Sequence, residues 1–280
     1  MDAKRPNRHT RFERCRLVAT SPHLAFGWTY AGNVVVNMPE KKRTLPMRLA
    51  VCILHYGKSD LTAKLHHQFL ASDPDKSIFV LDNASPEPYP KAWKRLDENL
   101  FWAGALNFAL GAFDREGYTH LWFCNNDMLF VSEPPYCTRA LARMERLEQQ
   151  SRVGLYSPSV TQNPYHRHMT AVPGATCRKA AYVDGIAPII NLACVKDIGG
   201  LDYEDNPLGY GVDVWLSLRA SRQGWGVWVD HALVVRHKYH TAAGEKAGFL
   251  SRAAEVENAY MIERLGQNWR KVLLELQTTF

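Results

Sequence analysis

Apolar runs alternate with helix-like segments through residues 48–150. Residues 48–54 (RLAVCIL), 77–81 (SIFVL) and 119–124 (THLWFC) are short apolar runs rich in strand-forming residues. Helical patterns cover residues 60–70, with Asp60 as an expected N-cap, and residues 102–113 and 139–149. This alternation predicts β-α-β units, and therefore an α/β fold with a mostly parallel central sheet flanked by helices.

The second half of the chain has a less regular pattern. Residues 153–156, 187–195 and 227–235 are apolar and predict strands, and residues 212–222 follow the three-to-four spacing of a helix. From residue 245 to about 276 the pattern predicts a long amphipathic helix or helix pair, interrupted near Gly266. The fold should therefore end in a helical segment.

Polar residues follow each of the first three predicted strands. In parallel sheets, ligands bind beyond the carboxyl ends of the strands, so residues there converge on one edge. Strands also commonly end in turn residues, and chance alone can produce such a pattern. We predict a binding pocket at this edge, lined by His55, Tyr56, Asp82, Asn83, Asn125, Asn126 and Asp127.

The composition is that of an ordinary globular protein, but its charge is unevenly placed. The chain has 280 residues, 46% hydrophobic and 22% charged, with a formal net charge of +6. Residues 1–48 carry ten Lys and Arg against three Asp and Glu, a net +7, so the remainder is close to neutral. We interpret residues 1–46 as a basic N-terminal extension that either contacts anionic membrane or nucleic acid or is a simple solvated tail.

The cysteines and the apolar segments bear on the cellular compartment. The six cysteines form no C-x-x-C pair, and Cys52 and Cys124 lie inside apolar runs, as buried thiols do. No stretch approaches the roughly 18 consecutive apolar residues that span a bilayer, and no signal-peptide pattern opens the chain. We expect a cytoplasmic protein that is at most peripheral to a membrane.

Three side chains are candidates for chemistry. Asp127 follows a buried strand, where a carboxylate suits Mg2+ or Mn2+, although an Asp-capped turn explains it equally well. Asp213 stands in the first turn of a predicted helix, as a general base or as a carboxylate stabilised by the helix N-terminus. His237 ends the last predicted strand and is a possible metal ligand, with His240 as a nearby competitor.

Several common catalytic motifs are absent from the sequence. It has no G-x-x-x-x-G-K-[ST] loop, no G-x-G-x-x-G after the first strand and no G-x-S-x-G elbow. These absences argue against P-loop NTP hydrolysis, Rossmann redox chemistry and esterase-type catalysis.

Taken in order, seven segments resemble family-2 inverting glycosyltransferases of the rhamnosyltransferase-like branch. Residues 50–56 resemble the first strand of that family, and residues 79–85 (FVLDNAS) resemble its VVDNAS element. Residues 99–107 (NLFWAGALN) are similar to its N-x-G-F-A-G-G-x-N segment, and residues 121–127 (LWFCNND) to the LNND form of the DXD metal motif. The other three similar segments are residues 197–202 (DIGGLD), 211–219 (GVDVWLSLR) and 260–269.

The resemblance implies a GT-A fold over residues 47–280 and a metal-dependent glycosyltransferase. Such an enzyme moves a hexosyl or deoxyhexosyl group from a nucleotide-diphosphate sugar to a carbohydrate, lipid-linked or other hydroxyl acceptor, with inversion. It implies that Asp82 contacts the nucleotide base, that Asp127 binds Mn2+ or Mg2+ with His237 as second ligand, and that Asp213 is the base. By the same resemblance, the donor pocket includes Trp102, Gly104 and Asn107.

The sequence departs from the family pattern beside the expected base. Val212 replaces the acidic residue that usually precedes the base, and Trp215 replaces a second Asp. An alternative is therefore a catalytically inactive GT-A-type binding or scaffold protein. A sugar-phosphate nucleotidyltransferase would need a glycine-rich loop after the first strand, and residues 54–60 hold one glycine. The sugar, the nucleotide base, the acceptor and the oligomeric state stay open.

Overall fold

The computed structural model describes residues 46–239 and 247–278. The chain divides into two compact units, Met1–Thr44 and Leu45–Phe280, and the described residues all belong to the second. Nearly all of the predicted basic extension, and His240 as the alternative metal ligand, lie outside the described residues. The boundary at residue 46 stays a prediction.

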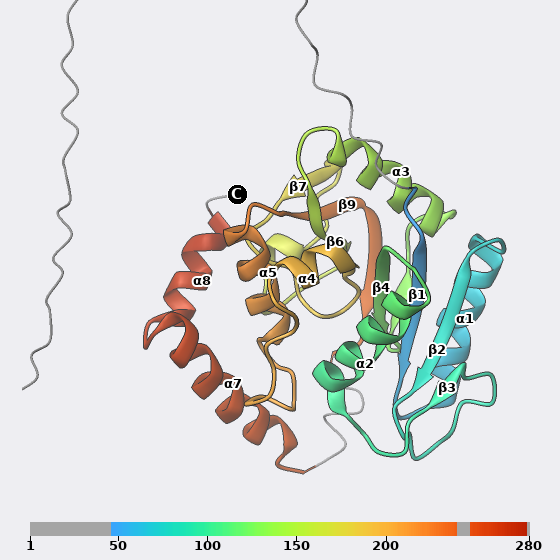
Figure 1. Cartoon of the computed structure of the whole chain (residues 1–280), viewed down its shortest axis with the longest axis horizontal. Helices are drawn as coiled ribbons and strands as arrows, with labels where there is room; N and C mark the ends of the chain where they lie inside the picture. Colours follow the sequence, from blue (N-terminus) through green and yellow to red (C-terminus); the bar gives the residue numbers. More distant parts are fainter. Residues whose placement is uncertain (1–45, 240–246, 279–280) are drawn as a thin grey trace, which may run out of the picture. The chain divides into compact units, whose positions relative to one another are not determined.

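A sheet with the strand order β3-β2-β1-β4-β8-β6-β9-β5 forms the centre of the second unit (Figure 1). Its first half is parallel, as predicted, and consists of β1 (Leu49–His55), β2 (Ser77–Asp82), β3 (Lys94–Arg95) and β4 (His120–Asn125). β1 is buried along its whole length, which fits its continuous apolar sequence. Cys52 and Cys124 are fully buried here, as predicted.

The second half of the sheet mixes parallel and antiparallel pairs. β8 is antiparallel to β4 and β6, β9 is parallel to β6, and β5 and β7 run antiparallel to β9. The predicted α/β class is confirmed, with a sheet that is mixed rather than mostly parallel. These strands are β5 (Met128–Phe130), β6 (Val153–Val160), β7 (Cys177–Lys179), β8 (Ile189–Asn191) and β9 (Gly226–His237).

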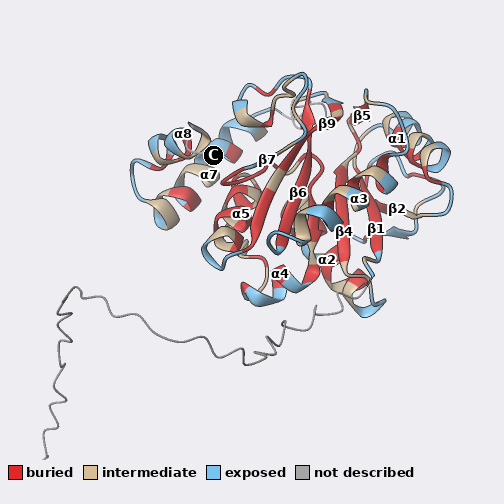
Figure 2. Ribbon diagram, turned by 90° about the horizontal axis from the view of Figure 1, so that it is seen from above, coloured by how far each residue is buried: buried red, intermediate tan, exposed pale blue. Residues whose placement is uncertain are grey.

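Helices α1 (Ser59–Ser72) and α2 (Phe101–Arg115) cover opposite faces of the sheet. Trp122 and Phe123 are neighbours on β4, so their side chains point to opposite faces. Phe69 of α1 packs edge-on against Trp122 at 5.3 Å, whereas Trp102 of α2 packs against Phe123 at 5.9 Å between ring centroids. In Figure 2 the strands are mostly coloured as buried, whereas the helices that flank them are partly exposed.

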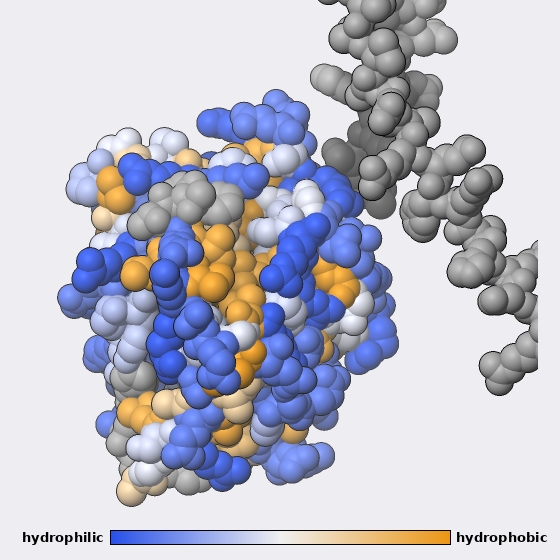
Figure 3. Space-filling model, turned by 90° about the vertical axis from the view of Figure 1, so that its left-hand side faces the viewer, coloured by the Kyte–Doolittle hydropathy of each residue, from blue (hydrophilic) through white to orange (hydrophobic). Residues whose placement is uncertain are grey.

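The remaining helices surround the second half of the sheet. α7 and α8 lie at one side of the unit, at the left of Figure 1, and their face is largely hydrophilic around an apolar strip (Figure 3). Gly266, with a φ of 83°, ends α7, so the predicted interruption is confirmed. The helices are α3 (Tyr136–Glu148), α4 (Leu192–Asp197), α5 (Val212–Arg222), α7 (Phe249–Leu265) and α8 (Trp269–Thr278), with a 3-10 turn η1 (Arg167–Met169).

Two local predictions were wrong. The expected strand over residues 187–195 is only the short β8, because the Asn191 side chain accepts hydrogen bonds from Ala193 N at 2.9 Å and Cys194 N at 3.4 Å and starts α4. Asp60 is not an N-cap: it lies in the first turn of α1 and pairs with Lys64 at 3.1 Å.

The carboxyl ends of β1, β2 and β4 meet at one edge of the sheet. His55 is paired in register with Asp82, and Leu54 with Asn125. The polar residues that follow these three strands therefore lie along one edge, as the sequence predicts. None of the helices that the structure describes is long and apolar enough to cross a membrane.

Candidate active site

The side chains of Asp127 and His237 meet at the edge where the parallel strands end. β5 pairs with β9 so that Met128 lies opposite His237, and Lys238 N donates a hydrogen bond of 3.0 Å to the Asp127 carbonyl. This pairing sets Asp127 Oδ1 3.0 Å from His237 Nε2. Two residues that are 110 positions apart thus form a contact pair.

The Asp127–His237 pair has the donor atoms of a divalent-metal site. Its side chains are 13% and 8% exposed, and the Tyr239 ring lies edge-on to the imidazole at 4.5 Å between centroids. A carboxylate oxygen and an imidazole nitrogen both suit Mn2+. Among the described residues, no group of three or more His, Cys, Asp or Glu side chains could hold a metal. This pair supplies two metal-coordinating atoms, and a molecule bound beside it would have to supply the remaining ones.

Asp184 lies beside this pair, although sequence reasoning did not identify it. Its Oδ2 accepts a hydrogen bond from Asn163 Nδ2 at 2.6 Å, and Asn125 N donates to the Ile186 carbonyl at 2.9 Å. Burial raises the pKa of the Asp184 carboxyl to about 6, while the nearby His237 acts in the opposite direction. The segment around Asp184 therefore joins the end of β4 to the neighbourhood of His237.

Asp213 stands in the first turn of α5, on the other side of this segment. Its Oδ2 accepts a hydrogen bond from Gly185 N at 2.6 Å, and its Oδ1 one from Val214 N at 2.9 Å. Burial raises the pKa of the Asp213 carboxyl to about 7, and the negative charges of Asp184 and Glu257 add to the effect. A carboxyl with such a pKa exchanges protons near neutral pH, as a general base must.

Gly185 connects α2 to α5 through its own peptide groups. Trp102 Nε1 donates to the Gly185 carbonyl at 3.0 Å, and the Gly185 N–H binds Asp213. A Cβ atom on Gly185 would lie 2.7 Å from Trp102 Cζ2 and 3.3 Å from Asp213 Oδ2. Only glycine allows this approach, so Gly185 sets the spacing between Trp102 and the carboxylate.

A hydrogen-bond chain joins the loop after β1 to the turn after β4. Asn126 Nδ2 donates to the Tyr56 carbonyl at 3.2 Å and to Thr62 Oγ1 at 2.9 Å. His55 Nε2 binds the Glu87 carbonyl at 2.7 Å, so it carries the ring proton, and Nδ1 accepts from Thr62 Oγ1 at 2.7 Å. His55 is fully buried, so its imidazole holds these loops together from inside the protein.

Asp82 and Asn83 organise the loop after β2. Asp82 is fully buried, and its carboxylate accepts from Ser85 N at 2.8 Å, Tyr89 N at 3.1 Å and Arg95 Nη1 at 2.7 Å. Both carboxylate oxygens of Asp82 thus bind within the chain, and its contact to a nucleotide stays a prediction.

Asn83 holds the start of α2. It accepts a hydrogen bond from Leu100 N at 2.9 Å and donates to the carbonyl of Phe101, whose φ is 53°. A bulky residue with a positive φ needs such support.

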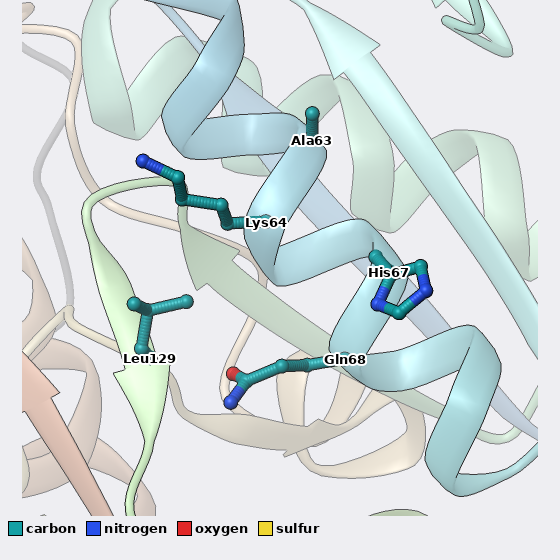
Figure 4. Close-up of a pocket in the computed structure, with 5 residues that line it drawn as sticks. All are labelled: Ala63, Lys64, His67, Gln68 and Leu129. Carbon is teal, nitrogen blue, oxygen red and sulfur yellow. The ribbon is translucent and has the colours of Figure 1, made fainter.

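A surface hollow lies away from these residues. It measures about 440 Å³ and lies between α1 and β5, with Lys64, His67 and Gln68 on one side and Leu129 on the other (Figure 4). It contains none of the residues that the sequence nominates for chemistry. Converging polar groups, rather than volume, mark the candidate site.

No family model matches the sequence. Uncharacterized proteins of Mycobacterium tuberculosis and Mycobacterium bovis are 29% identical to it over 145 residues, which are 50% of this chain and 54% of each relative. The match thus spans about half the length of these curated relatives.

Two solved glycosyltransferases have similar structures. GalNAc-T7, solved with UDP, GalNAc and Mn2+, has a TM-score of 0.56 at 11% identity, covering 81% of this chain and 49% of its own. The mannosyltransferase PcManGT from Pyrobaculum calidifontis, solved with GDP-Man and Mn2+, has a TM-score of 0.50 at 15% identity, covering 84% and 74%. This chain has the GT-A fold. At such identities the likeness concerns the fold alone.

The GT-A domain holds α2 against the loop that precedes α5. A Cβ on Gly104 would lie 2.9 Å from Leu100 Cβ, so this glycine permits close packing at the start of α2. Asn107 is exposed and donates to the Tyr203 hydroxyl at 3.3 Å. Three residues were predicted for a donor pocket. Trp102 contacts Gly185, Asn107 contacts Tyr203, and Gly104 packs closely against Leu100.

The departures from the family pattern have structural explanations in this GT-A domain. Val212 is buried, and the Trp215 indole donates to Asp202 Oδ2 at 2.8 Å. Arg264 of α7 binds Asp202 at 2.6 Å and Asp205 at 2.9 Å. Trp215 therefore attaches α5 to a loop that α7 also holds.

The sequence did not point to four residues of this environment: Asp184, Gly185, Asn163 and Glu257. Asp184-Gly185 is a turn-forming pair before an apolar run, and this was the one signal that could have drawn attention to it. Asn163 and Glu257 lie in segments without any comparable pattern. Their proximity to the site comes from the tertiary fold.

Proposed function

We propose that this GT-A domain is a metal-dependent glycosyltransferase that moves a sugar from a nucleotide-diphosphate donor to an acceptor hydroxyl. The observation that carries the proposal is the sequence of contacts from Asp127 and His237, past Asp184 and Gly185, to Asp213. Further support comes from the two solved structures of similar fold, which contain UDP or GDP-Man together with Mn2+.

Asp127 and His237 would hold Mn2+ or Mg2+, with diphosphate oxygens of the donor completing the ligand set. A bound divalent cation supplies Lewis-acid neutralisation of the charge that develops on the departing diphosphate, an effect of several kcal/mol. The 3.0 Å contact between Asp127 Oδ1 and His237 Nε2 places both donor atoms at one point before a ligand arrives. His237 Nδ1 is buried and makes no hydrogen bond within the described residues, so Nε2 is the nitrogen that is directed to the site.

Asp213 would act as the general base. Its carboxylate takes the proton of the acceptor hydroxyl as the acceptor oxygen bonds to the anomeric carbon and the bond from that carbon to the diphosphate breaks. A single displacement of this kind inverts the anomeric configuration. Gly185 N–H positions the carboxylate, and Trp102 fixes Gly185 from the other side.

The donor would lie along the edge formed by the loops after β1, β2 and β4. We assign the nucleotide to the side of His55, Tyr56, Asp82 and Asn83, and the hexosyl or deoxyhexosyl group to the side of Trp102, Gly104 and Asn107. Asn125 ends β4, and Asn126 belongs to the turn that presents Asp127. The acceptor is a carbohydrate, a lipid-linked molecule or another hydroxyl compound in this proposal. A cytoplasmic location, and contact of residues 1–46 with membrane or nucleic acid, stay predictions.

Nucleotide binding that depends on a metal is the direct test of this proposal. UDP, GDP and TDP are each added to the protein with and without Mn2+, and the unfolding temperature is measured. A nucleotide at a hundredfold excess over its Kd stabilises the fold by about 2.7 kcal/mol, which should raise the Tm by roughly 5–10 °C. One nucleotide should do so only with Mn2+. A protein that none of the three stabilises with Mn2+ would contradict the proposal.

A donor-hydrolysis assay separates an enzyme from an inactive scaffold of the same fold. The replacement of acids by Val212 and Trp215 favours the scaffold alternative. Slow release of nucleotide from the matching nucleotide-sugar should accompany binding if the domain is an enzyme. Binding without any hydrolysis or transfer would favour the scaffold.

The Asp184→Asn variant should shift the pH dependence of turnover to lower pH. The negative charge of Asp184 contributes to the raised pKa of Asp213, so its removal lets Asp213 ionise at lower pH. Asparagine keeps an oxygen that accepts from Asn163. The midpoint of the kcat–pH profile is the measurement, and Asp205→Asn, in the loop bound by Arg264, is the matched control. An unchanged midpoint in Asp184→Asn would show that the two carboxyls do not interact.

A further inference from the structure

A second cavity, of about 170 Å³, lies between η1, β7, the middle of β9 and α8. This volume is far larger than one water molecule requires. No Asp or Glu is among the residues that line it. Five basic or imidazole side chains do line it: Arg167, His168, Arg178, Lys179 and His231.

The three cations of this cavity have no acidic partner. Within the described residues, the side chains of Arg167, Arg178 and Lys179 make no ion pair and no hydrogen bond, in contrast to Arg143, which binds Asp230 at 2.6 Å. Burial lowers the pKa of His231, and the positive charge of Arg178 lowers it further, while the negative charge of Asp230 acts in the opposite direction. The cavity thus gathers positive charge that the protein itself leaves uncompensated.

The cavity combines three exposed cations, Arg167, Arg178 and Lys179, with a wall that hydrogen bonds hold in place. His231 is 5% exposed and its Nδ1 accepts a hydrogen bond from Val172 N at 3.3 Å. His168 Nε2 donates to the Tyr182 carbonyl at 2.8 Å, and Gln277 Nε2 donates to the Tyr182 hydroxyl at 2.7 Å. Gln277 also accepts from Arg167 N at 3.2 Å, so α8 closes the cavity against η1.

We propose that this cavity binds an anion of the phosphate class, either a small phosphate compound or the phosphate of a lipid headgroup. Three unpaired cations match a doubly charged oxyanion better than they match a single carboxylate. A guanidinium group can also donate two parallel hydrogen bonds to two oxygens of one phosphate. None of the residues that line the cavity is proposed as a metal ligand, base or donor contact, so the two sites consist of different residues.

Titration with inorganic phosphate in the absence of divalent metal tests the proposal on the full chain. The wild-type protein should bind phosphate, and Arg178→Gln should weaken binding about tenfold to a hundredfold, the usual effect of losing a charged hydrogen bond. Lys179→Gln, at a second exposed position, gives an independent measurement. Arg146→Gln, an exposed cation on α3 outside the cavity, is the matched control and should bind as wild type does.

Vesicle binding distinguishes the two sources of phosphate. Sedimentation is compared for vesicles of phosphatidylcholine with and without phosphatidic acid. A loss in Arg178→Gln that exceeds the loss in Arg146→Gln identifies a lipid headgroup, whereas equal vesicle binding with weakened inorganic phosphate binding identifies a soluble phosphate compound. If Arg178→Gln and Lys179→Gln, with wild-type unfolding temperatures, change neither phosphate nor vesicle binding, the proposal is wrong.

Discussion

An Asp213→Asn variant should transfer sugar about 10²–10⁴-fold more slowly than the wild-type protein, because it lacks the base that takes the acceptor proton. The substitution keeps the size of the side chain, and the amide oxygen still accepts the Gly185 N–H that binds Asp213 Oδ2 at 2.6 Å. Donor binding should therefore be unchanged. The measurements are kcat for transfer and the Kd of the nucleotide with Mn2+.

The pH dependence of turnover gives this prediction a second readout. The pKa of Asp213 is raised to about 7, and only its ionised form accepts a proton, so wild-type kcat should rise as pH increases through about 7. The residual activity of Asp213→Asn should lack this rise. An Asp213→Asn enzyme with full activity, or one with the wild-type pH profile, would show that another group is the base.

The unfolding temperature of Asp213→Asn distinguishes loss of the base from loss of the fold. Burial raises the pKa of Asp213 from 3.8 to about 7, so the folded protein binds this proton more tightly than the unfolded chain does. Ionising the buried carboxyl therefore costs stability progressively between about pH 4 and pH 7, and the full cost is present above pH 7. Asp213→Asn has no such cost, and above pH 7 it should unfold at a temperature at least as high as that of the wild type.

The parallel half of the fold was predictable because its signals are local. The apolar runs that form β1 and β4 are almost continuous, since both faces of these strands are buried, and β2 is buried in its second half. The failure at residues 187–195 has the same physical basis. An apolar run alone does not distinguish a strand from a buried helix, and the change from β8 to α4 depends on the Asn191 cap.

The candidate site was predictable only where its residues stand at the ends of elements. Asp127 follows β4 and His237 ends β9, so the topology alone brings them to one edge. Asp184 lies in an irregular segment, and its place beside His237 and Asp213 depends on contacts with Asn163 and α5 that no local pattern encodes. For this reason the sequence predicts the proposed metal ligands and the proposed base, but it does not predict Asp184, which lies between them.

The GT-A fold also explains why pattern matching alone misjudges α5. Trp215 stands where the resemblance to family-2 glycosyltransferases leads us to expect an acid, which suggests a lost function when only the sequence is considered. In the structure its indole donates to Asp202, and Arg264 binds the same carboxylate. The tryptophan thus takes a place in the support of the loop, and its presence is compatible with an intact Asp213.

An Asp127→Ala variant should lose both metal-dependent nucleotide binding and turnover. Asp127 is one of two protein groups proposed to hold the cation, and His237, 3.0 Å away, would be left as a single neutral ligand. Loss of several kcal/mol of charge stabilisation corresponds to a decrease in kcat/KM of about 10³-fold or more. The binding readout is the nucleotide-induced rise in Tm, which should no longer differ with and without Mn2+.

Two further variants decide whether the effect belongs to the metal. His237→Ala removes the other proposed ligand and should reproduce the loss of Mn2+ dependence, because either side chain alone leaves the site one protein ligand short. Asp205→Ala removes an acid that Arg264 binds at a distance from this pair and should keep the Mn2+-dependent rise in Tm. If Asp127→Ala and His237→Ala both fold and still bind nucleotide only with Mn2+, the cation is held elsewhere, and the contact between these side chains has a purely structural role.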